Sequence, residues 1–238
     1  MRADVLVEGE VAKASVRKAG VVKPPGPSDA VQSIDYARAR RVLARRDRVI
    51  GALIRTHGAC GLAGAQRGDP FRVLVQAIIS QQLSTRAART IGQRLAALYD
   101  GNLTPEAVVA TADPALRAVG LSGQKVRYLR DLCSRVQDGS LVLDSLAELP
   151  DADVIAALVQ VKGIGRWTAE MFLMFRLHRP DVLPVGDLGI IKAVQQAYGL
   201  RRLPSPARLA AIGESWRPYR SVACWYLWAS LGNPPGQD

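Results

Sequence analysis

The sequence predicts an all-α protein made of many short helices. From residue 35 onward, apolar residues recur at helical spacing, and no stretch of strict apolar–polar alternation is long enough to indicate a sheet. A helix start also recurs as a capping residue followed by proline, in Thr104-Pro105, Asp113-Pro114 and Ser205-Pro206. The side chain caps free amides of the first turn, and proline suits that turn because its missing amide has no partner there.

The expected helices cover, in order, roughly residues 35–57, 70–81, 84–99, 104–111, 114–119, 123–137, 151–160, 166–178, 187–198, 206–215 and 218–230. The segment 84–99 illustrates the pattern, because Ala87, Ile91, Leu95 and Leu98 form an apolar stripe along it. Helices this short are marginal alone, so we expect mutual packing to hold them.

The composition is that of a globular protein with a polyanionic partner. Of the 238 residues 48% are hydrophobic, and no apolar run approaches the roughly eighteen residues of a membrane span. Lys and Arg outnumber Asp and Glu by 32 to 21, and the resulting net charge of +11 favours nucleic acid. Ribosome-associated and membrane-surface proteins share such a charge, so composition alone leaves the partner open. The first residues lack the apolar stretch of a secretory signal, and we expect a cytoplasmic protein without membrane contact.

Three cysteines, Cys60, Cys133 and Cys224, lie far apart and form no CxxC pair. This pattern argues against a disulfide framework and against a zinc or iron–sulfur site. His57 and His178 are too few for a histidine-rich metal centre, so we expect no metal held by side chains.

The most informative stretch runs from residue 158 to residue 169. An apolar helix ends, Gly163-Ile164-Gly165 makes a tight turn, and a second helix begins at once. The glycines permit positive φ and leave amides accessible at the positive end of the new helix's dipole, while Ile164 can plug the gap between the helices. We expect a DNA phosphate to bind here, although the same turn could simply cap a helix. The expected backbone-binding residues are Lys162, Gly163, Ile164, Gly165, Arg166 and Thr168.

This stretch resembles the hairpin of the helix-hairpin-helix DNA glycosylase superfamily, most closely its alkylbase (3-methyladenine type II) branch. The likeness continues through residues 69–71, 78–84, 185–189 and 216–221, and covers roughly residues 40 to 232. Several ordered motifs over most of a chain are more specific than one short motif. The resemblance implies two helical subdomains flanking a DNA-binding cleft. It also implies a monofunctional base-excision enzyme that removes alkylated purines, of the 3-methyladenine and 7-methylguanine type, from double-stranded DNA.

The expected organisation has four parts. A flexible basic tail covers residues 1–34, and a short tail covers 233–238. Residues 35–69 and 181–232 together form a terminal helical bundle, and residues 70–180 form a central subdomain that ends in the hairpin. We expect a monomer.

Asp187 opens the expected helix 187–198, where in isolation it reads as an N-cap. The resemblance implies that it is the catalytic carboxylate, since the family's essential aspartate follows the hairpin helix at this place, and both roles can coexist. Cleaving an N-glycosidic bond builds positive charge on the sugar, which a fixed anion stabilises while it orients or deprotonates water. N-alkylated purines are already cationic and leave readily, so they demand little acid catalysis.

The hairpin residue Trp167 bears on the reaction type. Relatives that also nick the strand carry a lysine there, whose amine forms a Schiff base with the sugar. Tryptophan offers no amine, so we expect no lyase activity. The four-cysteine loop of the endonuclease III-like branch is missing, and we expect neither an iron–sulfur cluster nor a required cofactor; the resemblance allows a monovalent cation on the hairpin's main-chain carbonyls.

A stacked base must be flipped into a pocket before it can be cut. The resemblance implies Trp167, Trp228 and Met171 as pocket residues, and indole faces attract a cationic methylpurine. Met171 stands where the branch often has an aromatic residue, which leaves the base preference open. For three other aromatic residues we expect core packing: Trp216, Trp225 and Tyr226.

The turn after residue 81 is the expected wedge. Gln82 and Leu83 could enter the gap that a flipped base leaves, while the alternative is a plain interhelical corner with Ser84 as N-cap. Two other functions stay open from the sequence. One is a glycosylase for another damaged or deaminated base, and the other is a non-catalytic DNA-binding protein that kept the hairpin.

Overall fold

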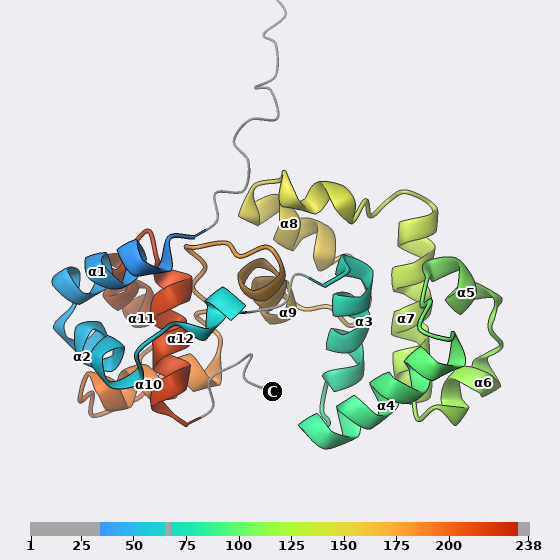
Figure 1. Cartoon of the computed structure of the whole chain (residues 1–238), viewed down its shortest axis with the longest axis horizontal. Coiled ribbons are helices and arrows are strands. Elements are labelled where there is room, and N and C mark those ends of the chain that lie inside the picture. The colour runs from blue at the N-terminus through green and yellow to red at the C-terminus, as the bar shows by residue number, and fades with distance from the viewer. Residues whose placement is uncertain (1–33, 65–67, 233–238) are drawn as a thin grey trace, which may run out of the picture. The chain divides into compact units, whose positions relative to one another are not determined.

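The computed structural model describes residues 34–64 and 68–232, and in these ranges it is all-helical, as the sequence predicts (Figure 1). The tails predicted at 1–34 and 233–238 lie outside the described residues, apart from residue 34. The α-helices are α1 (Tyr36–Arg46), α2 (Arg48–His57), α3 (Pro70–Ser80), α4 (Thr85–Leu98), α5 (Pro105–Ala110), α6 (Asp113–Ala118), α7 (Gly123–Gln137), α8 (Asp151–Leu158), α9 (Arg166–Met171), α10 (Leu188–Ala197), α11 (Pro206–Gly213) and α12 (Arg220–Ser230). Short helical turns occur at η1 (Gly61–Gly64), η2 (Asp144–Ala147), η3 (Phe172–Arg176) and η4 (Glu214–Trp216).

Two of the three predicted cap-and-proline starts are confirmed. Thr104 and Ser205 accept hydrogen bonds from first-turn amides of α5 and α11, each with proline in the first turn. The third prediction is wrong: α6 begins at Asp113 itself, and Ala112 precedes it without a side-chain cap. The Asp113 carboxylate instead pairs with Arg130 of α7 at 2.7 Å, which ties α6 to its neighbour.

The single helix expected over 35–57 is two helices, because Asp47 adopts an extended conformation between α1 and α2. One carboxylate oxygen of Asp47 accepts from the amides of Val49 and Ile50, which caps α2. The other accepts from the Tyr198 hydroxyl at 2.6 Å and the Trp216 indole nitrogen at 3.0 Å. Tertiary partners from distant segments therefore break the helix, and apolar spacing alone does not register them.

The pKa of Asp47 lies below its ordinary value. Burial raises the pKa, but hydrogen bonds from Tyr198, the Ile50 amide, Trp216 and Ser215 outweigh that effect. Since the folded pKa is lower than the unfolded one, this stabilisation is complete above the unfolded pKa and is lost as pH falls through the folded pKa.

Two further expectations need correction. The helix expected over 166–178 is α-helical only to Met171 and continues as a wider π turn, in which the Leu177 amide donates to the Phe172 carbonyl five residues back. In α4, Leu98 is 41% exposed and lies outside the buried stripe, because the helix packs through Ala88 and Leu95. At about 100° per residue Leu98 lies roughly 60–80° around the helix from those two residues, which turns it toward solvent.

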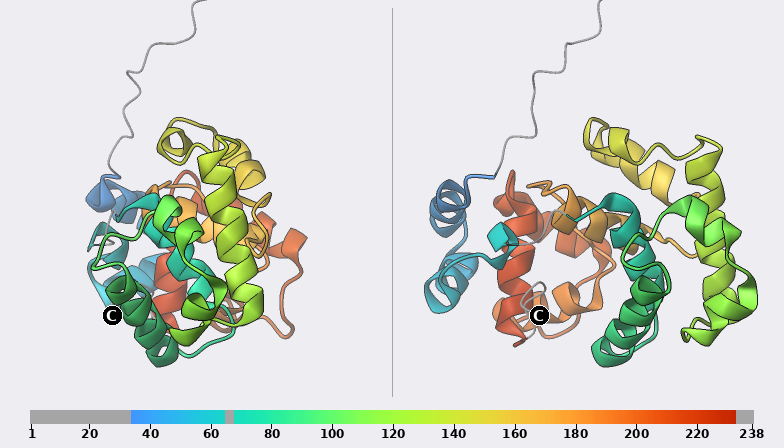
Figure 2. Two further views of the ribbon diagram at one scale, coloured as in Figure 1. Left: turned by 90° about the vertical axis from the view of Figure 1, so that its right-hand side faces the viewer. Right: turned by 45° about the vertical axis from the view of Figure 1, so that its right-hand side comes forward.

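The helices associate in two sets around one continuous apolar core. In the first set α12 packs on α1, α2 and α10, and its residues 221–229 are all buried (red in Figure 1). In the second set α3 packs on α4, α7 and η3, α5 and α6 pack on α7, and α8 packs on α9 (Figure 2). The expected core positions Trp216, Trp225 and Tyr226 are confirmed as buried. The subdomain boundaries proposed from the sequence stay a prediction.

No helix in the described part of the chain is both long and apolar enough to cross a lipid bilayer.

We predict that Asp47→Ala lowers the free energy of unfolding by about 3 kcal/mol, because it removes a cap, leaves the Tyr198 hydroxyl without its carboxylate acceptor and takes away one of the two acceptors of the Trp216 indole N–H. Urea unfolding followed by tryptophan fluorescence measures the loss. Asp35→Ala is the matched control, since Asp35 caps α1 from an exposed position through the Arg38 amide. Its cost should be about 1 kcal/mol or less. Equal losses in both variants would contradict the tertiary role of Asp47.

Candidate active site

The Asp187 carboxylate is fixed by three donors from three helices. It is 8% exposed and precedes α10, where Oδ1 accepts from the Ile190 amide at 2.7 Å as the helix cap. The same oxygen accepts from Trp228 Nε1 of α12 at 3.0 Å, and Oδ2 accepts from Trp167 Nε1 of α9 at 2.7 Å. A carboxylate held in this way cannot rotate freely, so its negative charge has a fixed position.

Gly189 permits the close approach of Trp228 to the carboxylate. A Cβ at this position would lie 3.0 Å from Asp187 Oδ1 and 3.1 Å from Trp228 Nε1. Both distances are shorter than ordinary van der Waals contact, so any larger residue would press directly on the hydrogen-bonded pair. The glycine in the sequence Asp187-Leu188-Gly189 is therefore part of the site.

An apolar hollow of about 380 Å³ lies between the end of α3 and the hairpin helix. Its lining residues are Val73, Leu74, Ala77, Ser80, Gln81, Gln82, Trp167, Thr168, Met171, Phe172 and Phe175. Aromatic and aliphatic groups dominate the lining, and none of these side chains is ionisable. Trp167 belongs both to this wall and to the carboxylate's partners, so the hollow and Asp187 adjoin.

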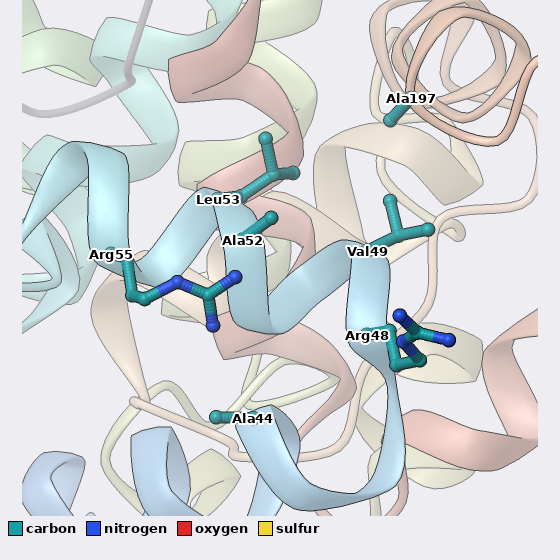
Figure 3. A pocket seen from close by; sticks show the side chains of 7 residues that line it. All are labelled: Ala44, Arg48, Val49, Ala52, Leu53, Arg55 and Ala197. Atoms are coloured by element: carbon teal, nitrogen blue, oxygen red, sulfur yellow. The ribbon is translucent and has the colours of Figure 1, made fainter.

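A second hollow of about 510 Å³ is formed by α1, α2 and α10 (Figure 3). Its polar groups are the guanidinium groups of Arg48 and Arg55, both on α2, and small aliphatic side chains form the rest. A site with this lining cannot stabilise developing positive charge, so the hollow beside Asp187 is the candidate for chemistry.

The hairpin joins α8 to α9. Gly163 has φ +84°, and a Cβ there would lie 2.1 Å from the Tyr128 ring, so this position requires glycine. Ile164 is buried, whereas a Cβ on Gly165 would meet open space. Since first-turn helix amides lack carbonyl partners, the turn presents donors where the backbone is uncovered.

The two basic side chains of the hairpin are exposed and have acidic neighbours. Lys162 Nζ lies 3.4 Å from Asp131, and Arg166 Nε donates to Glu170 at 2.9 Å. Glu170 is buried; burial raises its pKa above the ordinary value and the nearby Asp187 charge adds to the rise, while the hydrogen bond from Arg166 opposes it. Arg166 is thus held on the hairpin surface by a buried carboxyl group.

The turn that follows α3 lies against both the hollow and the hairpin. Gln82 lines the hollow, is exposed and has φ +58°, and Leu83 is 39% exposed. Gln81 Nε2 donates to the Gly163 carbonyl at 2.6 Å, which joins this turn to the hairpin. Ser84 caps α4, as expected for a plain interhelical corner. The same turn carries Gln82 and Leu83, so it can be a corner and also supply the predicted wedge.

The cysteines stand apart from this site. Cys60, Cys133 and Cys224 are buried free thiols, and burial raises the pKa of Cys60 and of Cys133 to about 12. No group of three or more His, Cys, Asp or Glu side chains within residues 34–64 and 68–232 is arranged to hold a metal ion.

A family model for HhH-GPD superfamily base excision DNA repair proteins matches residues 75–218. The chain belongs to this family. The match spans most of the wall of the hollow, the hairpin and Asp187, and the resemblance stated from the sequence is confirmed.

The HhH-GPD chain has similar curated and solved relatives. DNA-3-methyladenine glycosylase 1 of Schizosaccharomyces pombe is 34% identical over 166 residues, which are 68% of this chain and 73% of that protein. The crystal structure of a DNA-3-methyladenine glycosidase from Bacillus halodurans has a TM-score of 0.73 at 37% identity, covering 82% of this chain and 89% of that one. A 3-methyladenine DNA glycosylase of S. pombe in complex with abasic DNA has a TM-score of 0.72 at 30% identity, covering 82% and 97%. The predicted helix-hairpin-helix glycosylase fold is confirmed.

The structure brings most of the predicted site residues of this HhH-GPD chain together. Trp167 and Met171 line the hollow, while Trp228 lies behind it, with its ring 6.0 Å from that of Phe175 and its N–H on Asp187. Thr168 is buried in the same wall and is not on the hairpin surface. The functional roles assigned to these residues from the sequence stay predictions.

Sequence reasoning missed three contributors to the site. Phe175 follows Met171 by four residues, a helical spacing that pointed to the same wall, although the π turn changes the register. Glu170 could have been paired with Arg166 from their spacing alone. Nothing in the sequence signalled the bond from Gln81 to Gly163, because the two residues lie 82 positions apart.

We predict that Asp187→Ala lowers the free energy of unfolding by about 2–3 kcal/mol, because α10 loses its cap and the buried Trp228 N–H loses its acceptor. Asp187→Asn should cost less than about 1 kcal/mol, since its carbonyl oxygen can serve both the Ile190 amide and Trp228, while Trp167 can turn to solvent. Thermal unfolding of the two variants measures the difference. Equal losses would show that the charge, and not the acceptor, stabilises this region.

Proposed function

We propose that this chain is a monofunctional DNA glycosylase that flips alkylated purines out of duplex DNA and hydrolyses their N-glycosidic bond in base excision repair. The observation that carries the proposal is the Asp187 carboxylate, fixed by two indole N–H groups and a helix amide beside an apolar, aromatic hollow. The relatives named DNA-3-methyladenine glycosylase support the same activity.

The hollow suits a flat, cationic leaving group. A base flipped into it would contact Trp167, Met171 and Phe175, and an indole face attracts a cation by about 2 kcal/mol or more when water is excluded. Since the lining residues include no ionisable side chain, the wall cannot protonate a neutral base as it leaves. This favours N-alkylated purines, of the 3-methyladenine and 7-methylguanine type, which already carry positive charge.

Asp187 would act at the sugar. As the bond from C1′ to the base lengthens, the electron pair goes to the base and positive charge develops on the sugar, where a fixed carboxylate stabilises it. Water then adds to C1′ and releases a proton, which Asp187 would accept. The products are the free base and an intact abasic strand, because Trp167 offers no amine to continue to strand cleavage.

The hairpin would hold the DNA backbone. The uncovered turn at Gly165 and the exposed Lys162 and Arg166 suit a phosphate group, which amides and cations bind without reading sequence. The S. pombe relative solved with abasic DNA supports duplex DNA as the partner. We also propose that the protein acts as a monomer.

Two expectations remain proposals beside the main one. A monovalent cation could bind main-chain carbonyls of the hairpin; the Gly163 carbonyl accepts from Gln81 and the Val161 carbonyl accepts from the Ile164 amide, and each oxygen keeps a second lone pair. The second proposal is a cytoplasmic location.

The decisive experiment measures base release from methylated duplex DNA by the wild-type protein and by Asp187→Asn. The wild type should release methylpurines and leave alkali-labile but uncut strands. The variant should bind DNA like the wild type and lose at least 10²-fold in turnover, roughly the cost of a fixed electrostatic group. Binding without release by the wild type would indicate a non-catalytic DNA-binding protein. Release of deaminated bases alone would show that the substrate is a deaminated base and not an alkylated purine.

We also predict that Gly189→Ala reduces turnover about tenfold by displacing the Asp187 carboxylate a few tenths of an ångström, while the free energy of unfolding changes by less than about 1 kcal/mol. Single-turnover rates and urea unfolding give the two quantities. Gly123→Ala is the control, because that glycine also lies in a helix's first turn and its added Cβ meets Arg127 only at 3.8 Å. A normal rate in Gly189→Ala would contradict a fixed carboxylate position.

A further inference from the structure

One face of α7 contacts both the proposed wedge turn after α3 and the hairpin. Lys125, Tyr128 and Asp131 follow one another at spacings of three residues, so they lie along one side of the helix. We call them the α7 ladder. Its first member contacts the turn after α3, and its other two contact the hairpin. In both views of Figure 2, α7 and α3 lie side by side, as their packing requires.

Lys125 binds the backbone next to the wedge. Its ammonium group donates to the carbonyls of Ile79 and Gln81, the latter at 2.8 Å. Ile79 lies in the last turn of α3 and Gln81 is its C-cap, so neither carbonyl has an amide partner within the helix. Gln82 follows directly with φ +58°, a conformation that non-glycine residues rarely adopt and that needs support from outside.

Tyr128 and Asp131 hold the hairpin at the other end of the ladder. The Tyr128 ring lies where a side chain on Gly163 would be. Asp131 Oδ2 accepts from the Lys162 amide at 3.0 Å, and its other oxygen lies 3.4 Å from Lys162 Nζ. Burial raises the pKa of Asp131, but the hydrogen bonds from Lys162 and Arg135 outweigh it and hold the pKa below its ordinary value.

A direct bond closes the arrangement, since Gln81 Nε2 donates to the Gly163 carbonyl at 2.6 Å. The wedge turn and the hairpin are therefore joined to each other and each to α7. A phosphate bound at the hairpin would fix the position of the DNA backbone. The wedge must enter the base stack at a set distance from that phosphate.

We infer that Lys125 is a positioning residue for base flipping, which with Asp131 holds the Gln82–Leu83 wedge in register with the phosphate-binding hairpin. The inference rests on the proposed function. Extruding a paired base costs a few kcal/mol, and a well-placed wedge offsets that cost. The ladder makes no hydrogen bond with Asp187 and meets the hollow's lining only at the main-chain carbonyl of Gln81, so it should influence flipping far more than the bond-breaking step.

The test compares two duplexes that carry a single 7-methylguanine, opposite cytosine in one and opposite an abasic site in the other. Lys125→Met should lose about 10- to 100-fold in single-turnover release from the paired duplex, and less than about threefold where the base is already unpaired. Arg117→Met is the matched control, since it removes one positive charge from an exposed position on α6. It should behave like the wild type on both duplexes.

Asp131→Asn keeps the side chain's size and provides a second variant should Lys125→Met fold poorly. It should show the same selective loss. An equal loss on the two duplexes, or none on either, would overturn the positioning role while leaving the proposed function standing. Absence of release by the wild type from both duplexes would overturn the proposed function and this inference together.

Discussion

The structure depends on holding the buried Asp187 carboxylate in one position. Asp187 is largely removed from water, and a carboxylate in such a place is tolerated only when its oxygens accept good hydrogen bonds. Here the donors come from α9, α10 and α12, three helices distant in sequence. Their relative positions are therefore constrained by chemistry as well as by packing.

That constraint explains features that packing alone does not require. α12 is buried along nearly its whole length, which fixes the depth at which Trp228 meets α10. Gly189 removes the one side chain that would separate them. On the other side, the π turn after Met171 places Phe175 against Trp228 at 6.0 Å and in the wall of the hollow. π turns of this kind occur often at functional sites, since the extra residue redirects a side chain.

The fold class, most helix positions and the family could be predicted from the sequence, because apolar spacing, capping residues and the hairpin motif are local signals. The break at Asp47 could not, since Tyr198 and Trp216 compete for its side chain from more than 150 positions away. Asp113 failed as a cap for the same reason, as Arg130 uses its carboxylate. Local propensity predicts a helix end only where no tertiary partner offers a stronger bond.

Some residues of the site lie in recognisable sequence motifs, and others reach it only through the packing of the helices. Asp187, Trp167 and the glycines of the hairpin stand in recognisable stretches, whereas Lys125, Asp131 and Gln81 act through main-chain atoms of other segments. Main-chain partners leave no pattern of complementary residue types in the sequence. Both groups meet at α9, because Gly165 is its N-cap at the hairpin and Trp167, two residues on, donates to Asp187. The hairpin turn that faces the DNA backbone and the indole that holds the carboxylate therefore belong to one short element, and a motif of a few residues encodes both.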